Sequence, residues 1–586
     1  MRVCYPATMQ QVFCQNCTTA FTIEDADSEF YEQMHVPHPT FCPACRFQRR
    51  MTHVNTCNLY PRVLTPGGNP MISMYSQDKK LHIVEDKDWH DPDHFDFFSF
   101  GKHYDFAKPF FAQFHDLWKV VPLPHLQRAH STFENSEYCN AASSLKNCYL
   151  VINADFIEDC MYGFATEETK YCVDFSFTNK SELCYEVVNL QNCYSCLFCH
   201  DCENCNGLWW SQDCVGCTDC FGCSGLRHQS HCLFNVKLSK EEYEREVAKR
   251  TCTSWASLQK TREECERFFL TQPRKFMKGT NNESVDGDNI YQSTDVHESF
   301  LIKKAEHCKF SHFLSYVTSG TSHAYDYSMF GVAAEYVYEC TWCGLGVNNM
   351  KFCLWNYGAA DLEYCIGCHY SKNLFGCIGL QHKQYCILNK QYTKNEYEEI
   401  LPRIKQQMMN VPYKDMKGNE YRYGEFFPSE LSPFDYNQSW ARDFCPLTQE
   451  EAIRQSFGWH ETKERPPRDA IHWNDLPDDI ADVKDEHMVK PILCKAYDEN
   501  PTKAMEHNCT QYFKIIPQEL EFYRRMGLAL PKYCHNSRHF HRLQHINPFH
   551  LWDRACAKCQ KNMKTSYAPN RPEIIYCEEC YLKTVY

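Results

Sequence analysis

Cysteines recur through the middle of the chain at a fixed spacing. Between Cys139 and Cys232, every gap between successive cysteines is 3, 9 or 12 residues, and Asn, Asp or Glu stands beside many of them. A spacing in multiples of three indicates a repeating coil, in which like residues of successive turns stack on one another. An α-helix would need a period of 3.6 residues and would disfavour so many Asn, Gly and aromatic residues. The pattern therefore predicts a parallel β-helix over residues 131–238.

The coil pattern is repeated 154 residues further along the chain. Phe221-Gly222-Cys223 returns as Phe375-Gly376-Cys377. Each copy is followed by a Ser or Thr with a Glu three residues later, at residues 239–242 and 393–396, and this is the sequence of a helix-capping box. We therefore predict a mainly β fold, in which a two-part parallel β-helix solenoid carries short capping helices and its second part covers residues 290–392.

Both ends of the chain carry two C-x2-C motifs. Four thiolates on two tight turns satisfy a zinc ion tetrahedrally, and they leave no open position for catalysis. We therefore predict one structural zinc-ribbon module at each end and two zinc ions in total. The predicted ligands are Cys14, Cys17, Cys42 and Cys45 in the first module, and Cys556, Cys559, Cys577 and Cys580 in the second.

The two terminal modules are copies of one another. A shift of 492 residues superposes them without a gap, and Ser537 and Glu506 then stand where the N-terminal copy has cysteines. Cys494 or His507 could supply the missing ligands only if the loop between them folds back. We therefore interpret three cysteines of the C-terminal copy as a degraded metal site: Cys494, Cys509 and Cys534.

The cysteine ladder admits two further interpretations. The run from Cys193 to Cys205 contains the C-x2-C-x2-C spacing of an iron–sulfur motif, but no C-x3-C-P sequence completes it. We favour a packed ladder inside the coil. A redox, iron–sulfur or soft-metal protein that uses the ladder is the first alternative, and a self-assembling structural protein with stacking coil ends is the second.

Composition places the chain among folded proteins with reduced thiols. Its 586 residues include 39 cysteines, an odd number, whereas secreted disulfide scaffolds are usually short and fully paired. The N-terminus has no signal-like apolar run, and no segment reaches the roughly 18 apolar residues of a membrane span. We therefore expect a cytoplasmic protein. An aromatic content of 15% excludes disorder over most of the length.

Charge differs between the coil and the C-terminal module. The first coil has four basic and twelve acidic side chains between residues 139 and 232, whereas residues 532–586 have nine basic and four acidic ones. Basic and aromatic residues beside a zinc ribbon favour nucleic-acid binding, although the same residues could instead brace the fold, as a similar cluster in the N-terminal copy suggests. The predicted contacts to RNA, DNA or a nucleoprotein are Lys532, Arg538, His541, Arg542, His545 and Arg554.

Sequence motifs for catalysis are missing. The chain has no G-x-S-x-G elbow, phosphate-binding loop, H-E-x-x-H motif or dinucleotide fingerprint, so we expect no enzyme.

The whole layout resembles an uncharacterised family of cysteine-repeat proteins with terminal zinc ribbons from small-genome uncultivated (candidate phyla) bacteria. The resemblance rests on residues 41–46, on the Asn-Cys-Tyr repeats, and on residues 513–523 and 565–573. The stretch 201–205 is similar to the β-helix of tubulin-folding cofactor C and cyclase-associated proteins, which implies architecture alone.

These features together predict a non-enzymatic zinc-binding scaffold or adaptor. Its ribbons would contact nucleic acid or a nucleoprotein, and its acidic β-helix would contact protein partners. The predicted segments are the N-terminal ribbon (1–86), a linker with an aromatic-rich helix (87–130), the first half of the β-helix (131–238), a helix and polar linker (239–289), the second half (290–392), a helix and acidic linker (393–493) and the C-terminal ribbon (494–586).

Overall fold

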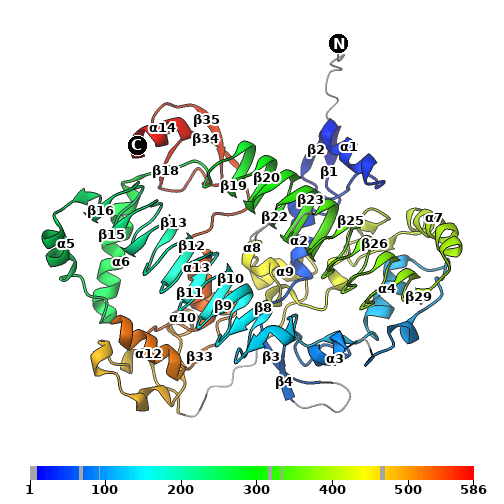
Figure 1. Cartoon of the computed structure of the whole chain (residues 1–586). Coiled ribbons are helices and arrows are strands. Elements are labelled where there is room, and N and C mark those ends of the chain that lie inside the picture. The colour runs from blue at the N-terminus through cyan, green and yellow to red at the C-terminus, as the bar shows by residue number, and fades with distance from the viewer. Residues whose placement is uncertain are drawn as a thin grey trace. The chain divides into compact units, whose positions relative to one another are not determined.

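Parallel coils fill the middle of the chain, and short hairpins and helices with clustered cysteines lie at its ends (Figure 1). This arrangement confirms the predicted mainly β, two-part solenoid with a cysteine module at each end. Within the described part of the chain, no helix has the length and apolar character that a membrane span requires. The computed structural model describes residues 10–64, 70–91, 93–314, 320–331, 334–461, 467 and 469–586.

The chain divides into two compact units, each of which joins segments that are distant in the sequence. The first unit combines Met1–Leu126 with Lys278–His460, and the second combines Gln127–Met277 with Glu461–Tyr586. The N-terminal module therefore belongs with the second coil, and the C-terminal module belongs with the first coil. The predicted order of segments along the chain does not reveal this crossed pairing.

The first coil is built from turns of twelve residues. Met161 pairs with Val173, which in turn pairs with Tyr185, all in parallel. The coil ends in an antiparallel pair that closes its last turn. Its strands are β7 (Phe133–Glu134), β8 (Asn140–Lys146), β9 (Ile152–Glu158), β10 (Met161–Glu167), β11 (Val173–Ser176), β12 (Tyr185–Gln191), β13 (His200–Glu203), β14 (Asn206–Trp209), β15 (Thr218–Phe221), β16 (Ser230–Leu233) and β17 (Val236–Lys237).

The backbone of this coil changes direction every three residues. Residues such as Asn147 and Asp159 have left-handed φ angles of 52° and 53°, and the cysteines that follow them point into the coil and are buried. A left-handed conformation costs most L-residues roughly 1–2 kcal/mol, and Asn, Asp and Gly tolerate it best. The Asn-Cys and Asp-Cys pairs in the sequence are therefore one turn residue followed by one interior residue.

Cysteine suits the interior of so narrow a coil because its thiol also satisfies backbone groups. The Cys172 thiol donates to the carbonyl of Lys170 (3.2 Å) and accepts the N–H of Cys184 from the next turn (3.2 Å). Ser181 plays the same part, since its hydroxyl accepts the N–H of Cys193. Burial raises the pKa of the Cys172 thiol well above its ordinary value. Cys172 is thus a hydrogen-bonded thiol that is held in its neutral form.

The second coil has the same construction, but the number of residues per turn varies along it. Ala324 pairs with Val337 thirteen residues later, whereas Met350 pairs with Leu362 twelve residues later. This coil begins at Glu283, before the predicted residue 290. The sequence pattern does not reveal its first turns, because they carry no cysteine ladder. Its strands are β19 (Glu283–Tyr291), β20 (Thr294–Lys303), β21 (Ala305–Lys309), β22 (His312–Leu314), β23 (Thr321–Phe330), β24 (Glu335–Cys343), β25 (Asn348–Lys351), β26 (Ala360–Glu363), β27 (Lys372–Phe375), β28 (Gln384–Ile387) and β29 (Lys390–Gln391).

Helices follow both coils where the capping boxes predict them. Ser239 caps α5 (Lys240–Val247) and Thr393 caps α7 (Lys394–Asn410), and in both cases the side chain of the third helical residue bonds back to the cap. In the second unit, α6 (Trp255–Leu270) follows α5. In the first unit, α4 (Phe110–Trp118) packs Phe110 against Tyr364 and Phe375 of the second coil. The predicted capping boxes are confirmed.

Candidate metal centres and the helices they position

The N-terminal cluster brings together the four predicted cysteines. All four sulfur atoms lie within 4.8 Å of one another, and the Sγ atoms of Cys17 and Cys42 are 3.7 Å apart. Tetrahedral zinc with Zn–S bonds of about 2.3 Å would place its sulfurs about 3.8 Å apart. Cys14 and Cys17 lie on the turn between β1 (Gln10–Phe13) and β2 (Ala20–Ile23), and Cys42 is the N-cap of α2 (Pro43–Thr52).

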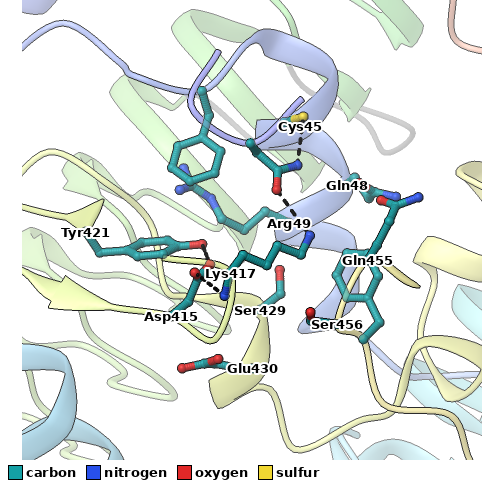
Figure 2. Close-up of a pocket in the computed structure, with 13 residues that line it drawn as sticks. Cys45, Gln48, Arg49, Asp415, Lys417, Tyr421, Ser429, Glu430, Gln455 and Ser456 are labelled. Atoms are coloured by element: carbon teal, nitrogen blue, oxygen red, sulfur yellow. Dashed lines mark hydrogen bonds between the residues drawn. The ribbon is translucent and has the colours of Figure 1, made fainter. Parts of the chain in front are cut away.

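A small cavity of about 30 Å³ lies beside Cys45 (Figure 2). Next to it, the side-chain amide of Asn16 donates to the Cys45 Sγ (3.3 Å), and the ammonium group of Lys417 donates to the Asn16 Oδ1 (3.1 Å). The Lys417 ammonium also lies 4.8 Å from the centre of the Phe457 ring. The cavity has room for about one water molecule, so it fits a polar shell around the cysteines and not a substrate.

The C-terminal cluster has the same design. Its four sulfurs also lie within 4.8 Å of one another, and the Sγ atoms of Cys559 and Cys577 are 3.7 Å apart. Burial raises the pKa of the Cys556 thiol, but backbone N–H groups of Cys577 and Cys559 outweigh this effect and lower the pKa to about 6. A thiol that ionises readily is a good metal ligand. The turn between β34 (Trp552–Ala555) and β35 (Asn562–Thr565) and the start of α14 (Glu578–Val585) carry these cysteines.

The three cysteines of the predicted degraded site also lie together. The sulfurs of Cys494, Cys509 and Cys534 are within 4.8 Å of one another, and all three side chains are buried. The loop that follows Cys494 therefore folds back. This fold is what Cys494 needs in order to replace a missing ligand, as the sequence predicts. Cys534 is the N-cap of α13 (His535–Leu543).

Each cluster places the start of a helix that is fixed to a coil. In α2, the Arg46 guanidinium lies 2.8 Å from the Asp326 carboxylate of β23, and Arg49 lies 2.7 Å from Glu339 of β24. Arg49 also pairs with Glu425 at 2.9 Å. All five side chains are almost completely buried. Arg46 directly follows Cys45, and Arg49 lies one helical turn later. The position of the cluster therefore determines where both guanidinium groups contact the coil.

The C-terminal module repeats this attachment in the second unit. Arg538 and Arg542 of α13 both lie 2.6 Å from the Asp174 carboxylate of β11, and Arg538 also lies 3.1 Å from Glu519 of α12 (Pro517–Met526). In α14, the Tyr581 hydroxyl donates to the Asp213 carboxylate of the first coil. Three helices that start at cysteine clusters are thus fixed to coils.

These contacts correct the predicted nucleic-acid surface. Arg538 and Arg542 are buried in ion pairs, and the buried Lys532 ammonium lies 5.1 Å from the centre of the Trp473 ring. The Arg554 guanidinium donates to three backbone carbonyls. The two histidines face aromatic neighbours: His541 meets Tyr533 at 4.9 Å and His545 meets His200 at 4.5 Å between ring centres. The buried Lys532, Arg538 and Arg542 brace the fold, which is the alternative stated above, whereas His545 is exposed.

The carboxylates that pair with these arginines have no signature in the sequence that marks them as buried. Asp174, Asp326 and Glu339 occupy left-handed turn positions that point away from the coil interior, and they are buried because a terminal module covers them. One related signal lies in the modules themselves. The shift of 492 residues superposes Asp27 on Glu519, so both copies of the module keep a buried acid that forms an ion pair: Glu519 with Arg538, and Asp27 with Lys309 of the second coil.

The coil ladder forms no comparable cluster. Among the described residues, no three ladder sulfurs belong to a group whose members all lie within 4.8 Å of one another. Their bonds to the backbone favour the packed-ladder interpretation. Comparison with protein-family models and with curated proteins finds no match for this sequence.

Proposed function

We propose that this protein is a zinc-dependent scaffold in which metal sites hold two acidic coils and their terminal modules in fixed units. One observation carries the proposal. The third cysteine of each four-cysteine cluster, Cys42 or Cys577, is the N-cap of a helix whose next turn contacts a coil. Metal binding at the cluster would therefore set the position of that helix.

The buried ion pairs explain why such positioning matters. A buried charge without its partner is strongly destabilising, so Arg46 and Arg49 stabilise the unit only when α2 has the right position and angle. Structural zinc sites supply apparent folding free energies on the order of 10 kcal/mol, which is enough to fix a helix start. Zinc is the metal that four cysteine thiolates at this spacing favour. We infer a structural and not a catalytic role for it.

Metal analysis of the full chain, purified with a reductant, tests this proposal. We expect zinc in at least two equivalents and no iron. Removal of the metal with a chelator should expose α2 and α14 to proteolysis while the coils stay resistant. Stoichiometric iron with visible absorbance would instead support the ladder as a redox centre, and unchanged proteolysis after complete zinc loss would contradict the scaffold.

A nucleic-acid partner is the second candidate, on a different surface from the one predicted. Lys558, Lys561 and Lys564 are exposed on or beside the hairpin β34–β35, which carries the C-terminal cluster. Exposed lysines on a rigid hairpin fit a phosphate backbone. Crosslinking in cells should place nucleic acid on residues 552–565, and changing the three lysines to Gln should abolish the crosslinks. Crosslinks confined to the acidic coils, or none at all, would contradict this partner.

A protein partner fits the second unit, where a groove of about 550 Å³ lies between the first coil and α12. Asp159 and Glu137 supply negative charge on the coil side, and Glu521 adds to it from α12. Tyr149 and Phe522 supply aromatic surface. We propose that basic peptide segments bind here, and that Glu521→Lys would weaken binding of an oligolysine or oligoarginine probe.

A further inference from the structure

We propose that Cys494, Cys509 and Cys534 bind a third zinc ion, and that His507 is its fourth ligand. The site is separate from the two four-cysteine clusters. The scaffold proposal therefore does not depend on it, although both rest on the same thiolate chemistry.

The three sulfurs have the spacing of an intact site. The Sγ atoms of Cys509 and Cys534 are 3.6 Å apart, compared with 3.7 Å for the corresponding pairs in the two four-cysteine clusters. The Cys534 N–H donates to the Cys494 Sγ at 3.2 Å. In the intact C-terminal cluster, the N–H of Cys577 donates to the Sγ of Cys556 at 3.3 Å. Cys494 therefore stands in the place of a first ligand.

The backbone around Cys494 reproduces the N-terminal site. The N–H of Cys14 donates to the carbonyl of Thr19 (3.0 Å), and the N–H of Cys494 donates to that of Gln511 (2.8 Å). The shift of 492 residues superposes Thr19 on Gln511. The short strands β32 (Ile492–Leu493) and β33 (Tyr512–Phe513) form the antiparallel pair that β1 and β2 form in the other module.

The next residue repeats the match. Gln15 donates its N–H to the carbonyl of Thr40 (3.0 Å), and Lys495 donates to that of Lys532 (2.9 Å), which is the superposed position. Residues that follow Cys494 form the short helices α10 (Lys495–Glu499) and α11 (Pro501–Glu506) before the chain returns to Cys509. An insertion has thus lengthened the first C-x2-C turn and moved its first cysteine, while the backbone frame of the metal site is kept.

The fourth corner of the site is occupied differently. Ser537 takes the helix position of Cys45 and Cys580, and its Oγ lies 3.3 Å from the Cys534 Sγ. The His507 Nε2 lies 3.0 Å from this hydroxyl. A neutral imidazole nitrogen is an ordinary zinc ligand and completes a Cys3His set, whereas a serine hydroxyl does not ionise readily. We infer that Nε2 moves into the corner beside Ser537 when the metal binds.

The position of His507 is restricted by its surroundings. Its ring stacks on Phe540 of α13, with ring centres 4.5 Å apart and planes 10° apart. His507 is buried, as are the three cysteines. The ring therefore stays next to the cluster, in which the three sulfurs already lie within 4.8 Å of one another and only the fourth ligand has to move into place.

Zinc counting on the reduced full chain tests the site. We expect three zinc ions per wild-type chain and two in Cys494→Ser. The matched control Cys252→Ser, a buried cysteine outside the cluster, should keep three. A count of two in the wild type that Cys494→Ser leaves unchanged would overturn the site, and a disulfide between Cys509 and Cys534 in the wild type would do the same. Failure of the four-cysteine sites would instead appear as a zinc count that Cys577→Ser leaves unchanged.

Two further variants keep the proposal falsifiable if Cys494→Ser does not fold. Ser537→Cys restores a fourth thiolate, and we expect it to retain the third ion against a chelator longer than the wild type does. With Co²⁺ in place of zinc, it should also raise the sulfur-to-metal charge-transfer absorbance of that site by about a third, from three thiolates to four. His507→Ala should release the third ion more readily. An unchanged release rate would remove His507 from the ligand set.

Discussion

Arg538 of α13 and Asp174 of β11 form an ion pair of 2.6 Å, although 364 residues separate them in the sequence. The corresponding pair in the other unit joins Arg46 to Asp326 at 2.8 Å. Arg46 and Arg538 are superposed by the internal duplication, so both copies of the module use one guanidinium to attach to a coil. Each of these arginines directly follows the fourth position of its cysteine cluster, Cys45 or Ser537, so metal binding at the cluster would be linked to the assembly of the unit.

Replacing Asp174 by Ala is expected to destabilise the second unit by about 3–5 kcal/mol, because the buried Arg538 would then keep only Glu519 and the buried Arg542 would lose the carboxylate that it pairs with. The midpoint of the urea-unfolding transition of the zinc-loaded protein measures the effect. Lys583→Ala, which removes an exposed ion pair on α14, should leave the midpoint almost unchanged. A similar small change for Asp174→Ala would contradict the structural role of the pair.

The coil ladder makes a prediction about the chemistry of one thiol. Cys172→Ser should cost less than about 1 kcal/mol, because a hydroxyl can keep the bonds to Lys170 and Cys184, as Ser181 does one column away. Cys172→Val keeps the bulk but leaves the Cys184 N–H without its acceptor, and should cost about 1–3 kcal/mol. Thermal unfolding compares the two variants. Equal losses, or loss of a coloured metal centre in both, would favour the redox interpretation.

A buried histidine of the second coil predicts a pH dependence of stability. His369 stacks on Tyr357 with ring centres 4.7 Å apart, and burial lowers its pKa from 6.5 to about 3. Between pH 6.5 and pH 3, His369 is protonated in the unfolded chain but stays neutral in the folded chain. The free energy of unfolding is therefore not reduced by this residue above pH 6.5, and it decreases progressively as the pH falls toward 3. At pH 5 the loss amounts to about 2 kcal/mol.

Comparison of the wild type with His369→Phe isolates this effect, because acid also releases zinc from both proteins. Phenylalanine keeps the stack on Tyr357 and cannot be protonated. We expect the difference in unfolding free energy between the two proteins to shift by about 2 kcal/mol in favour of the variant between pH 7.5 and pH 5. Parallel pH profiles would show that His369 is not responsible.

The sequence predicts local features of this fold well, because each depends on residues close together in the chain. The three-residue step of the ladder follows from a backbone that turns at Asn147, Asp159 and their equivalents, and the C-x2-C turns place their own sulfurs. Both kinds of feature are set by short-range geometry, so spacing alone is sufficient to find them.

The crossed pairing of modules and coils could not be predicted in this way. It depends on which turn carboxylates, such as Asp174 and Asp326, form ion pairs with a distant arginine. An outward-facing turn residue has the same sequence pattern whether it faces solvent or another module. Cys494 could be assigned only to a degraded site for a related reason, since the insertion after it breaks the motif while the backbone frame stays. A basic count of residues 532–586 likewise cannot separate Arg538, which is buried, from Lys561, which is exposed.

The shell around the N-terminal cluster predicts how tightly the metal is held. Asn16 donates to the Cys45 sulfur at 3.3 Å and is itself held by Lys417, so Asn16→Ala removes a bond that stabilises negative charge on this ligand. Losing such an outer-shell partner typically weakens metal binding by about 10–100-fold. Competition with a chromophoric chelator should reveal one zinc ion that leaves at lower chelator concentration. Gln11→Ala, an exposed residue of β1, is the matched control and should release its metal as the wild type does. If both variants behave alike, the hydrogen bond from Asn16 does not contribute to the site, and the chain from Lys417 to Cys45 only shapes the cavity.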